Sequence, residues 1–449
     1  MDLNELLARV EDKTLEFKRD ASSPLGILRT VVAFANSAGG VVLIGVEDAT
    51  RHVRGVVRPL DLEERLASLI SDSISPRLVP GIEVLPWRRL QLVAIEVYPS
   101  PSRPHHIVRE GPERGTYVRV GSTNRRADDD LIRELRRSAI GEGFDEQPVS
   151  DANSEAIDFR AAAELFADSR KLTRKDLETL RILVPHQGRL VPSVGGLVLL
   201  GHYRLERFPD AWIQAGRFAG LDRSKIIDST EIRTVLPQAA IDAVSFVQKH
   251  AMRAADIGPL QRRDRWSIPV VAVREAVINA IVHADYSQRG APIRLSIFDD
   301  RLEVESPGLL PVGVTVADLH RGISKLRNRV IGRVFHELGL IEQWGSGIQR
   351  MTTACREAGL PDPVLEEIAV RFRVTVPTTP TSKPAFDPVD QSILAALTDG
   401  PKSTSEIAAL IGRSQRTARN RLAKLVERGN VRETGMGPTD PRRRYTLSR

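Results

Sequence analysis

Two groups of residues in the second half of the chain have types and spacing that could do chemistry. Glu275 and Asn279 are four residues apart in an apolar run, so both lie on one face of a predicted helix. Gly345-Ser346-Gly347 precedes a second predicted helix, 348–358, whose N-terminal N–H groups can bind phosphate. The chain has no GxxxxGK[ST] sequence, which excludes a P-loop motor.

The C-terminal residues carry a concentrated positive charge. Residues 401–449 hold 12 Lys and Arg against 4 Asp and Glu, a net charge of +8 in a chain of net charge +7. The first 400 residues therefore sum to −1. A compact basic segment is typical of a protein that binds a nucleic-acid backbone.

The apolar periodicity of this segment predicts three helices, over 388–397, 403–411 and 414–427, and a β-hairpin over 431–447. A short helix, a tight turn and a second helix with a polar N-terminus form a helix-turn-helix, whose second helix enters the major groove. With the hairpin, the segment resembles a winged helix-turn-helix domain. We expect double-stranded DNA to be contacted by Ser414, Gln415, Arg416, Thr417, Arg419, Asn420, Arg442, Arg443 and Arg444. The alternative is a small helical domain used for protein contact.

The residues around Glu275 and Asn279 belong to an ordered set of motifs. The motifs are Glu275-Ala276-Val277-Ile278-Asn279-Ala280, His283-Ala284-Asp285-Tyr286, Glu305-Ser306-Pro307-Gly308, Gly322-Ile323-Ser324, Arg327-Asn328 and Gly345-Ser346-Gly347. This set resembles the GHKL-like ATPase domain of bacterial regulators that are often labelled as helicase-related.

The resemblance implies that the domain binds ATP and Mg²⁺. Asn279 would hold the Mg²⁺ that bridges the phosphates, and Glu275 would act as general base by orienting the attacking water. Further nucleotide contacts are implied for His283, Asp285, Glu305, Ser306, Gly308, Gly322, Arg327, Asn328, Gly345, Ser346 and Gly347. The family reads adenine with an Asp that precedes its first glycine motif, and the candidates at that place in this chain are Glu305 and Ser306. The regulators usually have Asn-Pro-Gly here, where this chain has Ser-Pro-Gly. Slow hydrolysis and a retained fold with an empty pocket both stay open.

The N-terminal residues carry a second ordered set of motifs. They are Glu16-Phe17-Lys18, Ala33-Phe34-Ala35-Asn36-Ser37-Ala38-Gly39-Gly40, Gly45-Val46-Glu47-Asp48 and Tyr117-Val118-Arg119-Val120-Gly121-Ser122. This set resembles the Schlafen-type AlbA-like domain, a nucleic-acid-binding module. In some relatives three carboxylates hold a metal for RNA cleavage, and Glu11, Glu16 and Asp48 lie at the corresponding places. Clustered carboxylates can bind Mg²⁺ or Mn²⁺ and activate water. The alternative is that these are ordinary strand-edge and turn residues.

The expected fold is multidomain α+β. It has an AlbA-like α+β domain over 1–140, a linker and mixed connecting region over 141–260, a GHKL-like α/β sandwich over 261–377 and the winged helix-turn-helix over 385–449. A helix over 25–36 and strands over 41–46, 92–98 and 116–120 are expected in the first domain. A hairpin of 293–298 with 301–305 is expected in the third.

These observations predict an ATP-binding, DNA-binding transcriptional regulator. The chain has no signal pattern, and its most apolar run, 194–200, is far too short to span a bilayer, so we expect a cytoplasmic protein with no membrane partner. RNA and a second copy of the chain are further partners to consider. Two other classes stay open: a metal-dependent nuclease acting on RNA or DNA, for example in phage defence, and a non-catalytic scaffold.

Overall fold

The structure is a computed structural model. It describes residues 2–447 except 49, 168–169, 252, 258–261, 267, 342–344, 380–387, 399, 428–429 and 435–443. The chain forms two compact units, Met1–Pro380 and Thr381–Arg449. None of the helices it describes is long and apolar enough to cross a bilayer.

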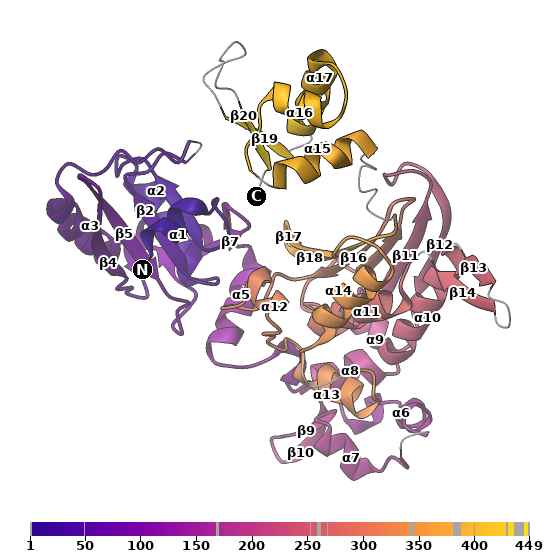
Figure 1. The fold of residues 1–449 in the computed structure, drawn as a ribbon. Coiled ribbons are helices and arrows are strands. Elements are labelled where there is room, and N and C mark those ends of the chain that lie inside the picture. The colour runs from indigo at the N-terminus through magenta and orange to yellow at the C-terminus, as the bar shows by residue number, and fades with distance from the viewer. Residues whose placement is uncertain are drawn as a thin grey trace. The chain divides into compact units, whose positions relative to one another are not determined.

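The first unit begins with a mixed four-stranded sheet in the order β1 (Leu15–Lys18), β2 (Gly40–Ile44), β5 (Leu90–Val97), β4 (Gly81–Trp87) (Figure 1). Helices α2 (Pro24–Ala35) and α3 (Pro59–Ser73) share an apolar core with this sheet. β2 can lie directly beside β1 because Gly40 has no side chain: a Cβ there would be 2.5 Å from the Thr14 carbonyl oxygen. The expected α+β domain is confirmed.

Shorter elements complete this part of the chain. They are α1 (Leu3–Ala8), β3 (Ile74–Ser75), β6 (His106–Ile107), α4 (Gly111–Arg114), β7 (Tyr117–Val120), β8 (Thr123–Arg126) and α5 (Asp129–Ala139). The residues around α5 form a small core of their own with the β7–β8 hairpin, and Leu309 and Val312 from far along the chain pack against it. The N-terminal domain is therefore joined to the next domain through apolar packing.

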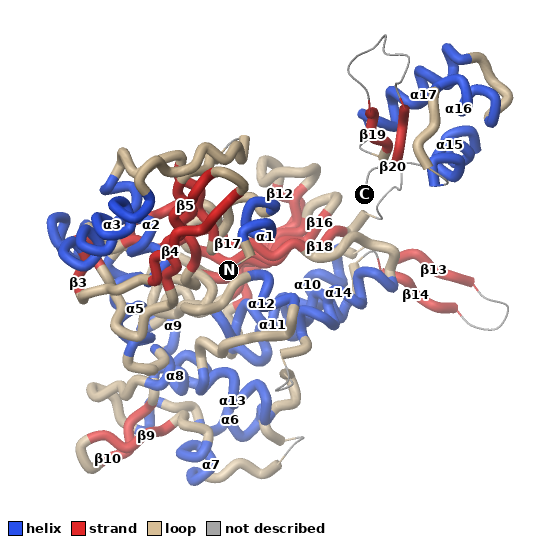
Figure 2. The backbone as a smooth tube through the Cα atoms, turned by 60° about the vertical axis from the view of Figure 1, so that its left-hand side comes forward, coloured by secondary structure: helices blue, strands red, loops and turns tan. Residues whose placement is uncertain are grey.

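The second part of this unit is a two-layer α/β structure. Its six-stranded sheet has the order β12 (Ile226–Ile232), β11 (Ile213–Phe218), β15 (Ile293–Ile297), β16 (Arg301–Pro307), β18 (Arg371–Pro377), β17 (Val364–Ile368). Helices α10 (Leu236–His250), α11 (Val270–His283) and α14 (Gly347–Glu357) pack on one face of it and share its apolar core (Figures 1 and 2). The expected hairpin is the pair β15 and β16.

The expected boundary at residue 261 does not fit this sheet. β11 and β12 precede that residue, and β11 pairs in parallel with β15 at the centre of the sheet. The remaining elements are α6 (Phe159–Leu165), α7 (Arg174–Thr179), β9 (Leu183–His186), β10 (Arg189–Pro192), α8 (Val194–Leu200), α9 (Arg204–Arg207), β13 (Arg253–Ile257), β14 (Arg262–Trp266), α12 (Val316–His320) and α13 (Arg329–Glu337). Much of the connecting region is thus part of the ATPase-like domain.

The start of the expected linker and connecting region is also packed. Asp145 is buried, and its carboxylate accepts hydrogen bonds from the N–H groups of Arg329, Val330 and Ile331 at 3.1, 2.6 and 3.1 Å. It therefore supplies the N-terminal cap of α13, which has no cap from its own flanking residue. Burial raises the pKa of the Asp145 carboxyl to about 6.

The second unit has the predicted arrangement of three helices and a hairpin. Its elements are α15 (Pro388–Thr398), α16 (Thr404–Leu410), α17 (Gln415–Glu427), β19 (Val431–Thr434) and β20 (Arg444–Leu447). α16 begins with a capping box, in which Glu406 N–H donates to Ser403 Oγ at 3.3 Å and Ser403 N–H to Glu406 Oε2 at 2.6 Å. Ile407, Leu422 and Tyr445 belong to its apolar core.

Candidate nucleotide-binding site

A cavity of about 700 Å³ opens between α11, the end of β16, α13 and the start of α14. Its volume lies within the range typical of small-molecule sites. It brings together eight of the residues predicted from the motifs, which come from three separate parts of the chain: Glu275, Asn279, His283, Ser306, Gly308, Gly345, Ser346 and Gly347.

The N-terminus of α14 meets Glu275 and Asn279 at one corner of this cavity. A Cβ on Gly347 would lie 2.7 Å from Glu275 Oε2 and 3.4 Å from Asn279 Nδ2, so a larger residue at this position would displace the Glu275 carboxylate. The glycine turn therefore brings the first-turn N–H groups of an 11-residue helix beside a carboxylate and an amide. Backbone donors at a helix N-terminus favour a phosphate group.

Two guanidinium groups fix the Glu275 carboxylate. Oε1 is 3.1 Å from Arg350 Nη2 and 3.4 Å from Arg274 Nη1. The side chain is buried, so these ion pairs compensate a charge that would otherwise be poorly solvated. Oε2 is the carboxylate oxygen that faces Gly347.

The charges and apolar surface of the cavity fit a nucleotide. Among the described residues, its lining has four cations, Lys325, Arg329, Arg333 and Arg350, against two carboxylates, Glu275 and Glu337. The apolar part of the lining includes Ala276, Ala280, Val304, Leu319, Phe372 and Val374. Excess positive charge suits a polyphosphate, and apolar walls suit a base.

His283 and Asn279 extend the polar part of the lining. Burial lowers the pKa of His283 to about 4, with a further lowering from Arg327, so its imidazole is neutral at pH 7. Asn279 lines the cavity beside Gly347, and its amide oxygen is a ligand type that Mg²⁺ accepts together with substrate phosphates. The described residues contain no group of three or more His, Cys, Asp or Glu side chains able to hold a metal by themselves.

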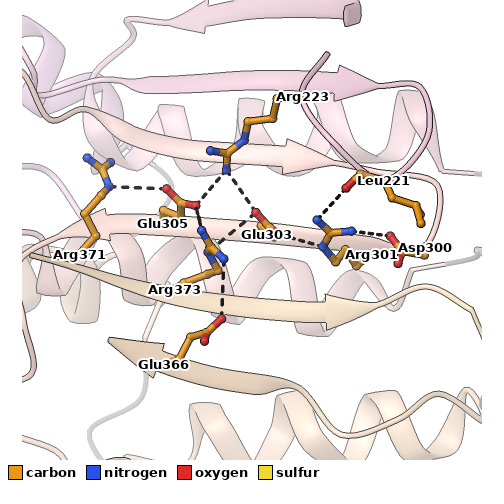
Figure 3. A network of polar contacts seen from close by, with 9 residues as sticks. All are labelled: Leu221, Arg223, Asp300, Arg301, Glu303, Glu305, Glu366, Arg371 and Arg373. Carbon is orange, nitrogen blue, oxygen red and sulfur yellow. Dashed lines mark hydrogen bonds and ion pairs between the residues drawn. The ribbon is translucent and has the colours of Figure 1, made fainter. Parts of the chain in front are cut away.

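Glu305 does not lie in the cavity, although Ser306 does. Successive residues of a strand face opposite sides of the sheet, and Glu305 lies on the face away from the helices (Figure 3). Its Oε1 is 2.7 Å from Arg373 Nη2 and 2.9 Å from Arg223 Nη2. The prediction that Glu305 is a candidate for reading adenine is therefore wrong for this geometry, and Ser306 is the candidate that remains.

Glu305 belongs to a polar network on that open face of the sheet. Figure 3 shows Arg223 reaching over from the β11–β12 connection to both Glu303 and Glu305, at 3.2 and 2.9 Å. Both carboxylates are buried under the surrounding arginines. The neighbouring guanidinium groups outweigh desolvation and hold the pKa of Glu305 below its usual value, although burial alone would raise it.

Arg327 also does not line the cavity. Its guanidinium forms an ion pair with Glu134 of α5 and donates to the Leu309 carbonyl. A Cβ on Gly308 would lie 3.2 Å from Arg327 Cζ, so Arg327 supports the cavity wall from behind. It joins the two domains of this unit and does not face a bound nucleotide.

The other three predicted residues outside the lining have local structural contacts. Asp285 accepts from Ser287 N–H and Oγ at 3.1 and 2.6 Å, which closes a turn after α11. Asn328 Nδ2 donates to the carbonyls of Val282 and Ala284 at 2.9 and 2.7 Å. The Gly322 carbonyl oxygen packs against Gly345, where a Cβ would lie only 2.7 Å away.

The predicted nuclease carboxylates do not form a metal site in the described part of the chain. Glu16 Oε2 is 2.7 Å from Arg119 Nη2, and Oε1 forms an ion pair with Lys18. Glu11 Oε1 accepts from Phe17 N–H at 2.7 Å. Burial raises the pKa of Glu11, with smaller contributions from Glu16 and Asp48. Arg119, a charged residue between two apolar strand residues, was the sequence signal that Glu16 has a buried partner.

The exposed surface of α17 carries the predicted DNA contacts. Gln415, Arg416, Arg419 and Asn420 are exposed, whereas Ala418 faces the core. Ser414 caps the helix, because its Oγ accepts from Thr417 N–H at 3.2 Å. Arg444 is 3.8 Å from Glu406 and donates to the Pro401 carbonyl at 3.1 Å. The other two predicted wing contacts, Arg442 and Arg443, lie outside the described residues.

Three family models match separate parts of the chain. Residues 11–128 match SLFN_AlbA_2, "Schlafen, AlbA_2". Residues 290–376 match HATPase_c_4, "putative ATP-dependent DNA helicase recG C-terminal", and residues 387–432 match HTH_20, "helix-turn-helix domain". The chain thus carries an N-terminal Schlafen AlbA_2 domain, an ATPase-type domain and a C-terminal helix-turn-helix domain, as the motifs predicted. No curated protein matches it.

Two solved structures show weaker likeness. The DIP2311 protein from Corynebacterium diphtheriae aligns over 99% of this chain and 96% of its own, with 20% identity and a TM-score of 0.43. The N-terminal domain of a "putative ATP-dependent DNA helicase RecG-related protein" from Nitrosomonas europaea covers 28% of this chain and 90% of its own, with 26% identity and a TM-score of 0.23.

Proposed function

We propose that this protein is an ATP-binding transcriptional regulator in which the nucleotide changes the affinity of the helix-turn-helix domain for duplex DNA. The observation that carries the proposal is the corner of the cavity where Glu275, Asn279 and the N-terminus of α14 meet under a net positive lining. The second requirement is a DNA-reading surface, which the exposed Arg416, Arg419 and Asn420 supply on α17.

Each residue of the site has a definite task in this proposal. The N–H groups of α14 and the lining cations bind the phosphates, and Asn279 holds Mg²⁺, which neutralises the phosphate charge. Glu275, fixed by Arg350, orients a water for slow hydrolysis. Ser306 lines the cavity at the end of β16, where its hydroxyl would contact the base.

Nucleotide can change DNA affinity only if it binds two states of the protein with different affinities. The same coupling then requires DNA to change the affinity for nucleotide by an equal factor. This reciprocity makes the regulator hypothesis testable from either ligand.

The test is fluorescence anisotropy of a labelled duplex from the region upstream of the protein's own coding sequence, titrated with the full chain with and without Mg²⁺ and ATP. We expect ATP to change the dissociation constant, and Asn279→Ala to abolish that change without altering nucleotide-free DNA binding. Arg416→Ala with Arg419→Ala should abolish DNA binding and keep ATP binding. An ATP-independent affinity, or cleavage of the duplex, would contradict the proposal.

A further inference from the structure

The nucleotide cavity and the N-terminal domain share one wall. Leu309, Leu310 and Pro311 line the cavity, and the same residues line a smaller pocket of about 140 Å³ whose other side includes Ser37 and Leu131 of the N-terminal domain. The wall is tied to that domain by a hydrogen bond from Gly313 N–H to the Ser37 carbonyl at 3.2 Å. One end of the cavity therefore reaches the junction of the two domains.

Lys325 lies at this junction and lines both pockets. Its side chain is largely exposed, and in the part of the chain that the structure describes no carboxylate lies within ion-pairing distance of it. Partial desolvation against the cavity wall lowers the pKa of its ammonium group, and Arg103 and Arg329 lower it further. Lys325 is thus a cation whose charged neighbours are cations.

Arg103 comes to the same place from the N-terminal domain. Its guanidinium donates only to neutral acceptors among the described residues: the carbonyls of Ser100 and Ser138 at 2.6 and 2.7 Å and Ser138 Oγ at 2.9 Å. Arg329, the third cation, is 3.1 Å from Glu146. Three positive charges with one carboxylate repel one another, and an anionic ligand would relieve that repulsion.

The position of Lys325 along the chain places it at the phosphate end of the cavity. Its neighbour Ser324 packs against the glycine turn, where a Cβ on Gly345 would lie 3.2 Å from Ser324 Oγ. That turn leads into the N-terminus of α14, beside Glu275 and Asn279. The unbalanced cations thus lie near the N–H groups that are expected to hold phosphate.

We propose that Lys325 and Arg329, which both line the cavity, bind the terminal phosphate of a nucleoside triphosphate there, and that Arg103 of the N-terminal domain, which lines neither pocket, adds to the positive potential around that phosphate. This inference rests on the proposed nucleotide binding and adds to it that the protein distinguishes triphosphate from diphosphate. It also makes the N-terminal domain contribute to the electrostatic potential of the nucleotide site, because Arg103 comes from it.

The test is isothermal titration calorimetry of the full chain with Mg²⁺ and, separately, a non-hydrolysable ATP analogue, ADP and inorganic phosphate. Lys325→Gln should raise the dissociation constant of the triphosphate analogue by about tenfold or more, as expected for loss of a charge-assisted contact. The dissociation constant of ADP should change by less than about twofold. Arg103→Gln should also lower the affinity for the triphosphate analogue more than the affinity for ADP. Arg321→Gln is the matched control, since Arg321 is exposed on the same segment and pairs with Asp318 at 3.5 Å.

The outcomes separate this inference from the proposed function. If wild-type protein binds neither nucleotide, the proposed function fails, and the role of Lys325 fails with it. If it binds both but Lys325→Gln weakens them equally or not at all, only the inference is overturned. Inorganic phosphate binding to wild type as tightly as the triphosphate would also overturn it, because the cations would then form a site for free phosphate.

Discussion

The α-carbon of Gly347 lies so close to Glu275 that a methyl group on it would be 2.7 Å from Glu275 Oε2. This contact sets how near the N-terminus of α14 can come to α11. It explains why the turn at 345–347 ends in a residue without a side chain. The contact links a backbone feature, the start of a helix, with the carboxylate and amide of another helix.

Gly347→Ala should therefore weaken binding of Mg²⁺ and ATP by about tenfold, because the added methyl group displaces the Glu275 carboxylate and occupies the space beside Asn279 at the N-terminus of α14. Calorimetric titration measures this effect. Gly81→Ala is the control, since a Cβ at Gly81 would have its nearest neighbour at 3.8 Å. Unchanged affinity in Gly347→Ala would show that phosphate does not bind at this corner.

Glu305→Gln should leave nucleotide affinity unchanged, because Glu305 lies on the face of the sheet away from the cavity. It should lower the free energy of unfolding by about 1–3 kcal/mol, since Arg223 and Arg373 each lose the nearer of their charged partners. Ser306→Val should do the reverse: retain stability and weaken nucleotide binding. Equal loss of nucleotide binding in both variants would mean that the adenine-reading residue has been misplaced.

Glu134→Gln should destabilise the larger unit by about 3–5 kcal/mol, because it leaves the Arg327 charge without its buried partner. Urea unfolding followed by tryptophan fluorescence measures the change. Glu164→Gln removes an exposed ion pair of the same type, with Arg160, and should cost no more than about 0.5 kcal/mol. Similar small losses of unfolding free energy in both variants would contradict a stabilising role of the Glu134–Arg327 ion pair between the two domains.

The contribution of His283 should lower stability as the pH drops from 7 to 5, against an opposite contribution from Asp145, whose raised pKa lets the folded state bind a proton first. The pKa of His283 is about 4 in the folded protein and about 6.5 when unfolded, so the unfolded chain binds the proton first. The loss from this residue is about 2 kcal/mol over that interval and is complete below the folded pKa. Unfolding of His283→Gln should show a correspondingly weaker pH dependence, while exposed His52→Gln should match wild type. Parallel pH curves for wild type and His283→Gln would be incompatible with a neutral buried imidazole.

Arg416→Ala and Arg419→Ala, made singly, should each reduce the salt dependence of DNA binding. If each guanidinium neutralises one phosphate, the slope of log K against log salt should fall by about 0.9 per substitution. A variant that relaxes base preference at one position and keeps the slope would instead mark a base-reading arginine. The pair Arg160→Ala and Arg174→Ala removes two exposed charges far from α17 in sequence and is the control. No change in either property would favour a protein-contact role for this domain.

Elements that depend on a local pattern of residues could be predicted from the sequence alone. The three C-terminal helices, the hairpin of β15 with β16 and the helix of Glu275 and Asn279 follow from apolar periodicity and turn residues. The gathering of Gly345–Gly347 with these two residues followed from resemblance, and the lining of the cavity agrees with it. Contacts that depend on one helix turn or one strand pair are visible in sequence because their partners are at fixed spacing.

The remaining features depend on partners far apart in the chain. Strand alternation places Glu305 and Ser306 on opposite faces, but which face the helices cover depends on packing. Arg327 and Glu134 are separated by 193 positions, so no spacing rule links them. β11 joins the sheet by pairing with a strand about 80 residues later, and its six residues carry no mark of that partner.

The cap that Asp145 provides for α13 restricts how this protein can evolve by recombination. An exchange of N-terminal modules upstream of Asp145 would leave the ATPase-like domain with its own helix cap. An exchange just beyond it would remove the acceptor for three N–H groups of a helix that begins 184 positions later and lines the nucleotide cavity. Viable chimaeras should therefore have their crossover points before Asp145, even though the polar, glycine-containing stretch between the two domains continues past it.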